Sequence, residues 1–146
     1  MERDELRNAL DRDELNYPAL AAEAGPGAID DLEALVAEDE PRIAPKAAYL
    51  AALIDADGSG RVIDLAAQSR HDVVRASAAA ALGSLTRDPA GPIADRLLAD
   101  PDAGIRARTV KSVSLLGDAS RESLRKVADE DDDADVRALA QELMAD

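Results

Sequence analysis

Few side chains in this sequence are of the types that perform chemistry. The chain has no cysteine, which excludes a thiol nucleophile, a thiolate metal site and a disulfide framework. His71 is the only histidine, and beside Asp72 it could act as a general base. Acid–base catalysis also needs a positioned partner and a pocket, and the sequence has no phosphate loop, dinucleotide fingerprint or zinc-ligand cluster. We therefore predict no catalytic residues, no cofactor and no enzymatic activity, with His71 as a solvated turn residue.

One loop carries the beginning of a calcium-binding pattern. Asp55, Asp57 and Ser59 place oxygen atoms at positions 1, 3 and 5 of a twelve-residue loop, with Gly60 at position 6. This spacing resembles the first half of an EF-hand, but position 12 is Ala66, where a bidentate glutamate closes the calcium shell. In the alternative, the segment is a connector in which Ser59 starts a helix. We predict no metal site, and this loop is the calcium candidate.

The chain is strongly acidic. It has 31 acidic residues against 17 basic ones and a net charge of -14, with 21 Asp, 10 Glu, 14 Arg and 3 Lys. The excess of Asp and the scarcity of Lys resemble the composition of proteins from salt-adapted organisms. At molar salt the Debye length falls to roughly 3 Å, so the acidity of the whole chain would repel an anionic partner only weakly. We interpret the acidic run 129–133 as a hydrated turn, with a diffuse cation site as the alternative.

Repeated helices must position these residues. Ile43, Val74, Ile105 and Val136 follow one another at intervals of 31 residues, and each opens a stretch with helical spacing of apolar residues. With no Phe, no Trp and two Tyr, alanine and leucine must fill the core, which favours closely packed helices. The predicted buried stripes are Val74, Ala78, Ala81, Leu82 and Leu85 in one repeat, and Ile105, Thr109, Val113 and Leu116 in the next.

A shorter amphipathic segment precedes each of these helices, so each repeat is a pair: a first helix, a tight acidic turn and a second helix. Asp72 and Asp102 are the predicted N-caps of two second helices, because a carboxylate accepts from the free backbone N–H groups there. Gly58, Gly83 and Gly117 lie near helix ends, where glycine tolerates a left-handed cap. Gly83 could instead permit close contact between helices.

The repeats resemble a known family. The segments 72–83 and 98–106 follow the pattern D-x-x-V-R-x-x-A-x-x-A-L-G, which is similar to HEAT-like repeats of the phycobilin-lyase type. The resemblance implies a single all-α domain, a right-handed α-solenoid of four to five helix pairs. It also implies that Arg75, Arg106 and Arg137 form a structural ladder, each tying one turn to an acidic residue of the next; we assign Asp72 and Asp102 to it. Ala44 departs from the pattern, since arginine is expected there. The predicted repeats are 28–58, 59–89, 90–119 and 120–146, preceded by a degenerate capping pair at 1–27 or, alternatively, a mobile arm.

The charges are distributed unevenly over the repeats. The second helices at 41–54, 73–85 and 103–116 contain six basic residues and no acidic ones. In solenoids of the resembled type the second helices line the concave side, where the repeat aligns Lys46, Ser77 and Arg108 in one row and Tyr49, Ala80 and Lys111 in the next. The sequence therefore predicts a cationic inner groove on an anionic body. The predicted partner-binding residues are Lys46, Tyr49, Ser77, Arg108 and Lys111.

These features favour a protein-interaction module, a scaffold or adaptor whose concave face binds an acidic protein partner. The alternative is a nucleic-acid-binding protein, since some HEAT-like DNA glycosylases grip the backbone with such a groove; the overall acidity and the two-tyrosine aromatic content oppose it. An enzyme of the phycobilin-lyase kind would rest on analogy of fold alone. Without a long apolar run or a signal peptide, we expect a cytoplasmic protein with no membrane partner.

Overall fold

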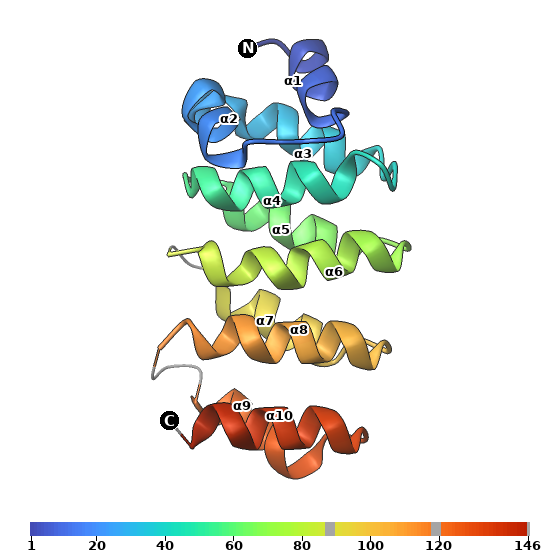
Figure 1. Ribbon diagram of the computed structural model, residues 1–146, viewed down its shortest axis with the longest axis vertical. Coiled ribbons are helices and arrows are strands. Elements are labelled where there is room, and N and C mark those ends of the chain that lie inside the picture. Colours follow the sequence, from blue (N-terminus) through green and yellow to red (C-terminus); the bar gives the residue numbers. More distant parts are fainter. Residues whose placement is uncertain (87–89, 118–120, 146) are drawn as a thin grey trace.

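A computed structural model describes residues 1–86, 90–117 and 121–145, and this part of the chain is helical (Figure 1). It contains ten α-helices, two short 3-10 segments and no strand. The prediction of an all-α solenoid of helix pairs is therefore confirmed. The helices are α1 (Arg3–Leu10), α2 (Tyr17–Ala24), α3 (Ile29–Ala37), α4 (Ala44–Ile54), α5 (Ser59–Ala67), α6 (Asp72–Ala81), α7 (Ala90–Leu98), α8 (Ala103–Ser114), α9 (Arg121–Glu130) and α10 (Ala134–Met144); the 3-10 segments are η1 (Pro26–Ala28) and η2 (Leu82–Ser84).

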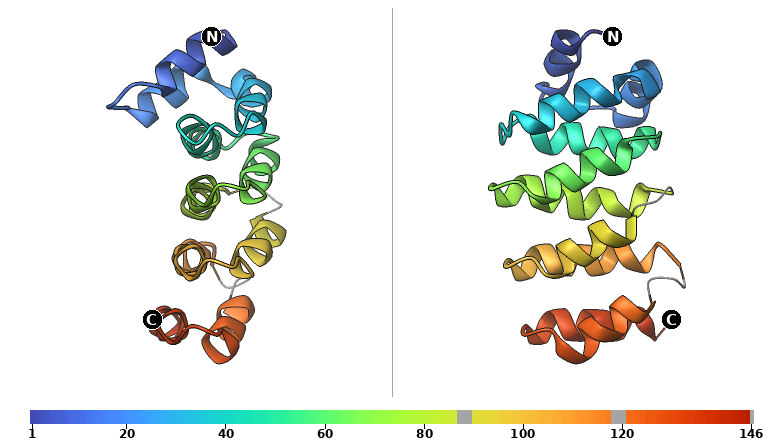
Figure 2. Two further views of the ribbon diagram at one scale, coloured as in Figure 1. Left: turned by 90° about the vertical axis from the view of Figure 1, so that its right-hand side faces the viewer. Right: turned by 180° about the vertical axis from the view of Figure 1, so that it is seen from behind.

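The helices form two layers. Helices α4, α6, α8 and α10 stack as successive rungs in one layer, and each contacts the next (Figure 1). The first helices of the pairs form the other layer, as the edge-on view of Figure 2 shows, and α3 packs on α5 and α5 on α7. We call these the second-helix layer and the first-helix layer. Both ends of the stack lean toward the second-helix layer (Figure 2).

The buried stripes predicted from the sequence form the core. Each of the four anchor residues, Ile43, Val74, Ile105 and Val136, is at most 3% exposed. Alanines then let neighbouring second helices approach closely, because a methyl side chain adds little bulk between two backbones. Two serines use this proximity: Ser77 Oγ of α6 donates to the carbonyl of Pro45 in α4 at 2.6 Å. In the same way, Ser112 Oγ of α8 donates to a carbonyl of α6 at 2.5 Å.

The turns between the paired helices agree with the sequence at one predicted N-cap and differ at the other. The Asp102 carboxylate accepts a hydrogen bond from the backbone N–H of Ile105 at 3.1 Å and so caps α8. The prediction for Asp72 is wrong, because Asp72 is the first residue of α6 and His71 holds the cap position. The Asp133 carboxylate caps α10 in the same way as Asp102 caps α8.

Glycine is required for two different reasons. Gly83 lies in η2, and a Cβ atom added there would be 3.1 Å from Leu115 Cδ1 and 3.5 Å from the Ser112 backbone, so it permits close contact with α8. Gly58 and Gly117 have φ of 91° and 88°, where a side chain is strained. Gly58 does not end α4, whose last residue is Ile54 and whose C-cap is Asp55; it directly precedes α5.

The N-terminal helices pack on the stack. Helix α1 contacts α3 and α2 contacts α4, so each lies in the layer that its order in the chain predicts. Ionic contacts add to this packing: Arg3 Nε lies 3.0 Å from Asp31, Arg7 Nη2 lies 2.5 Å from Glu38, and Arg42 pairs with Asp11. Helix α2 therefore extends the second-helix layer beyond α4.

Candidate functional site: a groove on the second-helix layer and an arginine ladder beside it

Two arginines that follow the repeat anchors make buried ion pairs between successive repeats. Arg75 Nε donates to Asp100 Oδ2 at 2.9 Å, and Arg106 donates through Nε and Nη2 to both carboxylate oxygens of Asp131 at 3.0 and 3.1 Å. The carboxylates of Asp100 and Asp131 are only 4% and 6% exposed. Such a two-point contact fixes geometry as well as charge. Each pair therefore joins a second helix to the turn of the following repeat.

The same arginines also hold their own turns. Arg75, Arg106 and Arg137 each donate through Nη1 to a backbone carbonyl six residues earlier, at 3.1, 2.9 and 2.6 Å. For Arg106 that carbonyl belongs to Asp100, whose side chain binds Arg75. The contacts thus run without a break from Arg75 through Asp100, Arg106 and Asp131 to Arg137. We call this series the arginine ladder.

The acidic members of the ladder are not the ones predicted. Asp100 and Asp131 hold the places predicted for Asp72 and Asp102. Each arginine contacts an aspartate just after the first helix of the following repeat, rather than the aspartate at the start of a second helix. The carboxylates of Asp100 and Asp131 also accept from the backbone N–H two residues later, each at 2.9 Å.

Repeat one shows the converse pairing. Ala44 stands where arginine is expected, and 25 residues later, where the ladder has aspartate, the chain has Ser69. The serine hydroxyl donates instead to Asp39 Oδ1 at 2.5 Å, and it accepts from the N–H of His71 at 3.0 Å. The arginine and the aspartate that would pair with it are thus both absent, so this position buries no uncompensated carboxylate.

The environment of Asp131 shifts its acidity. Burial favours the neutral acid, but hydrogen bonds from Arg106 and from the Asp133 N–H, with the charges of Arg106 and Arg137, favour the anion more strongly. The pKa of Asp131 is therefore lowered from its ordinary value, and the pKa of Arg106 is raised by the same hydrogen bond. A carboxyl group with a lowered folded-state pKa adds stability above its unfolded-state pKa and loses it as pH falls through the folded-state pKa.

We accordingly predict a pH-dependent effect of Asp131→Asn. The difference in unfolding free energy between wild type and variant should be largest near pH 7. It should begin to shrink as pH falls below about 4, where the carboxyl group of the unfolded chain takes up a proton, and should continue to shrink toward the lowered folded-state pKa. Urea unfolding followed by circular dichroism between pH 3 and 7 measures it. Asp132→Asn, at the exposed neighbour in the same turn, is the control and should show a small difference that varies little with pH. A difference for Asp131→Asn that stays constant with pH would contradict the ion-pair account.

The second-helix layer carries an open groove that gathers four of the five predicted partner-binding residues. Its volume is about 480 Å³, and it runs from α2 across α4 and α6 to α8. We call it the second-helix groove. Its lining consists of Tyr17 from α2, Pro45, Lys46 and Tyr49 from α4, Val73, Ala76, Ser77 and Ala80 from α6, and Arg108 from α8.

Aromatic rings form the N-terminal end of the groove. Tyr17 and Tyr49 meet edge to face, with ring centroids 4.8 Å apart and an interplanar angle of 68°. Burial, followed by the neighbouring Tyr49, raises the pKa of Tyr17, so its phenol remains neutral at physiological pH. Tyr17 is a site residue that was not predicted from the sequence. A signal exists, because Tyr17 and Tyr49 are the two aromatic residues of the chain and lie 32 residues apart, close to the repeat length.

The polar members of the groove differ in how far they are committed to contacts within the chain. Ser77 bonds Pro45, as described above, and Lys46 Nζ donates to the carbonyl of Arg12 at 3.2 Å. Arg108 is exposed. Lys111 is exposed on the same helix but is not one of the described residues that line the groove. The structure thus brings together Lys46, Tyr49, Ser77 and Arg108, and leaves Lys111 outside.

The calcium candidate is a connector with internal contacts. Asp55 ends α4 with φ of 48° and accepts hydrogen bonds from the backbone N–H and the hydroxyl of Thr86. The hydroxyl of Ser59 accepts from the N–H of Ala56 at 2.9 Å. The side-chain oxygen atoms of Asp55 and Ser59 are therefore engaged in hydrogen bonds within the chain. In the described ranges 1–86, 90–117 and 121–145, no three His, Cys, Asp or Glu side chains cluster in a way that could hold a metal ion.

His71 holds the cap position of α6 and is not among the described residues that line the groove. Its Nε2 accepts from Arg70 Nε at 3.4 Å and lies 3.9 Å from Asp39, so the nearest carboxylate is that of the preceding repeat rather than Asp72. The acidic run 129–133 divides between structural tasks. Asp131 joins the ladder, and Asp133 caps α10.

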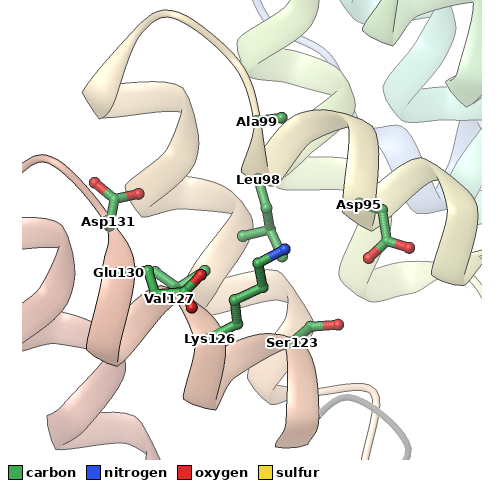
Figure 3. Close-up of a pocket in the computed structure, with 8 residues that line it drawn as sticks. All are labelled: Asp95, Leu98, Ala99, Ser123, Lys126, Val127, Glu130 and Asp131. Carbon is green, nitrogen blue, oxygen red and sulfur yellow. The ribbon is translucent and has the colours of Figure 1, made fainter.

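A second concavity lies on the opposite layer, between α7 and α9 (Figure 3). Its volume is about 490 Å³, and Lys126 extends across it toward Leu98. The lining residues are Asp95, Leu98, Ala99, Ser123, Lys126, Val127, Glu130 and Asp131. Of these, Asp131 is already paired with Arg106. The other lining residues mix acidic and basic side chains with apolar ones, so they do not indicate one class of ligand.

Within the described ranges, none of the helices combines the length and the apolar character needed to cross a membrane. None of the curated proteins compared with the chain matches it. The family described as HEAT repeats matches residues 61–145, which is more than half of the chain. HEAT repeats generally serve as protein-interaction scaffolds, and the family is typically non-enzymatic. The matched region covers nearly all of the second to fourth predicted repeats and contains the whole arginine ladder, and the chain therefore belongs to the HEAT repeat family.

Proposed function

We propose that the chain is a non-catalytic protein-interaction module that binds an acidic protein partner along the second-helix groove, on the concave side of the solenoid. The observation that carries this proposal is the composition of the groove. Two cationic side chains, Lys46 and Arg108, and two tyrosines surround an apolar floor on a molecule whose net charge is -14. These two cations attract carboxylates at short range and so favour an acidic partner that docks in the groove.

The uneven use of arginines supports the same conclusion. Arg75 and Arg106 form ion pairs within the arginine ladder, whereas Arg108, which lies on the same helix as Arg106, lines the groove. Apolar surface also remains uncovered there, since Val73 is 51% exposed. Together with the alanines and tyrosines of the lining, Val73 gives the groove an apolar floor between charges, as at many binding surfaces. Stacked helix pairs add a rigid frame, so little conformational entropy is lost when a partner binds.

Charge reversal tests the proposal. The triple variant Lys46→Glu, Arg108→Glu, Lys111→Glu should lower the affinity for the native partner at least tenfold, because it replaces attraction by repulsion at two positions in the groove and at the exposed Lys111 on the same helix as Arg108. Proteins captured from native extract by wild type and variant are compared by quantitative mass spectrometry, and affinities are then measured on the purified candidate. The matched control reverses three exposed arginines of the first-helix layer, Arg61, Arg96 and Arg125, with the same change in net charge, and should retain the partner. Equal loss in both variants, or capture that disappears after nuclease treatment, would contradict the proposal.

A further inference from the structure

The groove has a charge pattern along the solenoid axis that specifies more than a preference for acidic partners. Lys46 lies on α4 at one end and Arg108 on α8 at the other. Between them α6 contributes only small or apolar side chains, among them Val73, Ala76 and Ala80. The aligned row of Lys46, Ser77 and Arg108 thus reads basic, small, basic from one second helix to the next. A ligand that lies along the solenoid axis would contact two cations separated by a surface of small and apolar side chains.

The distance between the cations selects the conformation of the ligand. Packed helices lie about 8–10 Å apart, so α4 and α8 are separated by about 16–20 Å, and the long flexible side chains of Lys46 and Arg108 let the two charges adjust to a ligand of about this length. An extended chain advances about 3.3 Å per residue, so carboxylates four to six residues apart cover about 13–20 Å. In an α-helix the same four residues cover only about 6 Å. An extended segment therefore fits the groove.

From this geometry we infer that the second-helix groove recognises an extended acidic segment in which two carboxylates flank one apolar residue. Side chains of an extended chain alternate between two faces, so only even separations place both carboxylates and the apolar residue toward the groove. The pattern is Asp or Glu at positions 1 and 5, with an apolar residue at position 3, or the same pattern widened by two residues. The apolar side chain packs on Val73 and Ala80, and the carboxylates meet Lys46 and Arg108. This inference rests on the proposed function, since it describes the partner of that same groove.

Synthetic peptides provide the direct test. Fluorescent peptides on a Gly-Ser background carry one Leu and two Asp separated by three, four, five or six positions, and binding is measured by fluorescence anisotropy at low salt. We expect separations of four and six to bind about tenfold more tightly than three and five. The variant Lys46→Glu, Arg108→Glu should abolish the difference, and the first-helix variant Arg61→Glu, Arg96→Glu should keep it. Circular dichroism confirms that both variants are folded. Equal affinity at odd and even separations would overturn the inference.

An unbiased selection separates failure of the inference from failure of the proposed function. A random peptide library displayed on phage is selected on the wild-type protein and counter-selected on the Lys46→Glu, Arg108→Glu variant. Enrichment of two acidic residues at even separation around an apolar residue supports the inference. Peptides that depend on the groove but lack this pattern would overturn the inference and leave the proposed function standing. Binders that ignore both cations would contradict both.

Discussion

Replacement of Leu82 by Ala should lower the free energy of unfolding by about 2–5 kcal/mol. Leu82 is 0% exposed, and its segment η2 packs against α4, α6, α7 and α8, so both layers and three successive repeats meet around it. Truncation removes buried methyl groups and leaves a cavity that fixed helix backbones cannot fill. The melting temperature should fall by about 5–15 °C. Thermal and urea unfolding followed by circular dichroism measure both quantities.

Leu115→Ala is the matched control for this prediction. Leu115 lies beside Gly83 in the same region, but its side chain is 75% exposed. Its truncation should therefore change stability by no more than about 0.5 kcal/mol. Similar losses in the two variants would mean that the centre of the solenoid is not packed around Leu82.

The fold was predictable because it repeats. The interval of 31 residues between Ile43, Val74, Ile105 and Val136 fixes where each second helix buries its apolar face, and all four anchors are buried. Helix ends were less predictable, because Asp72 and Asp102 are both aspartates near a helix start, and only Asp102 has its carboxylate in capping position. A shift of one residue in the turn is enough to exchange a cap for a first-turn residue.

The site was predictable where it follows the repeat and unpredictable elsewhere. Lys46, Ser77 and Arg108 share one repeat position and meet in one groove. Tyr17 lies in the degenerate first pair, whose register the repeat does not define, so its separation of 32 residues from Tyr49 was the signal available for their contact. The true ladder residues left a signal that the sequence analysis did not use: Ser69, Asp100 and Asp131 are 31 residues apart, in step with Ala44, Arg75 and Arg106.

The arginine ladder predicts a graded series of stability losses on substitution by glutamine. Arg106→Gln should cost about 3 kcal/mol, because it leaves the Asp131 carboxylate buried without its two-point partner. Arg75→Gln should cost about 2 kcal/mol, since one nitrogen, Nε, contacts the carboxylate of Asp100 in that pair. Arg137→Gln should cost about 1 kcal/mol, the net value of a hydrogen bond to a carbonyl. Urea unfolding at pH 7 ranks the three variants under identical conditions.

The double variant Arg106→Met, Asp131→Leu distinguishes a buried charge pair from general damage to the turn. When both partners become apolar, no charge remains to be desolvated, so the double variant should be more stable than Arg106→Gln. It also loses the hydrogen bonds of Asp131 to the Asp133 N–H and of Arg106 to the Asp100 carbonyl, which keeps it below wild type. A double variant less stable than Arg106→Gln would show that these backbone contacts, rather than the ion pair between repeats, determine the cost of breaking the ladder.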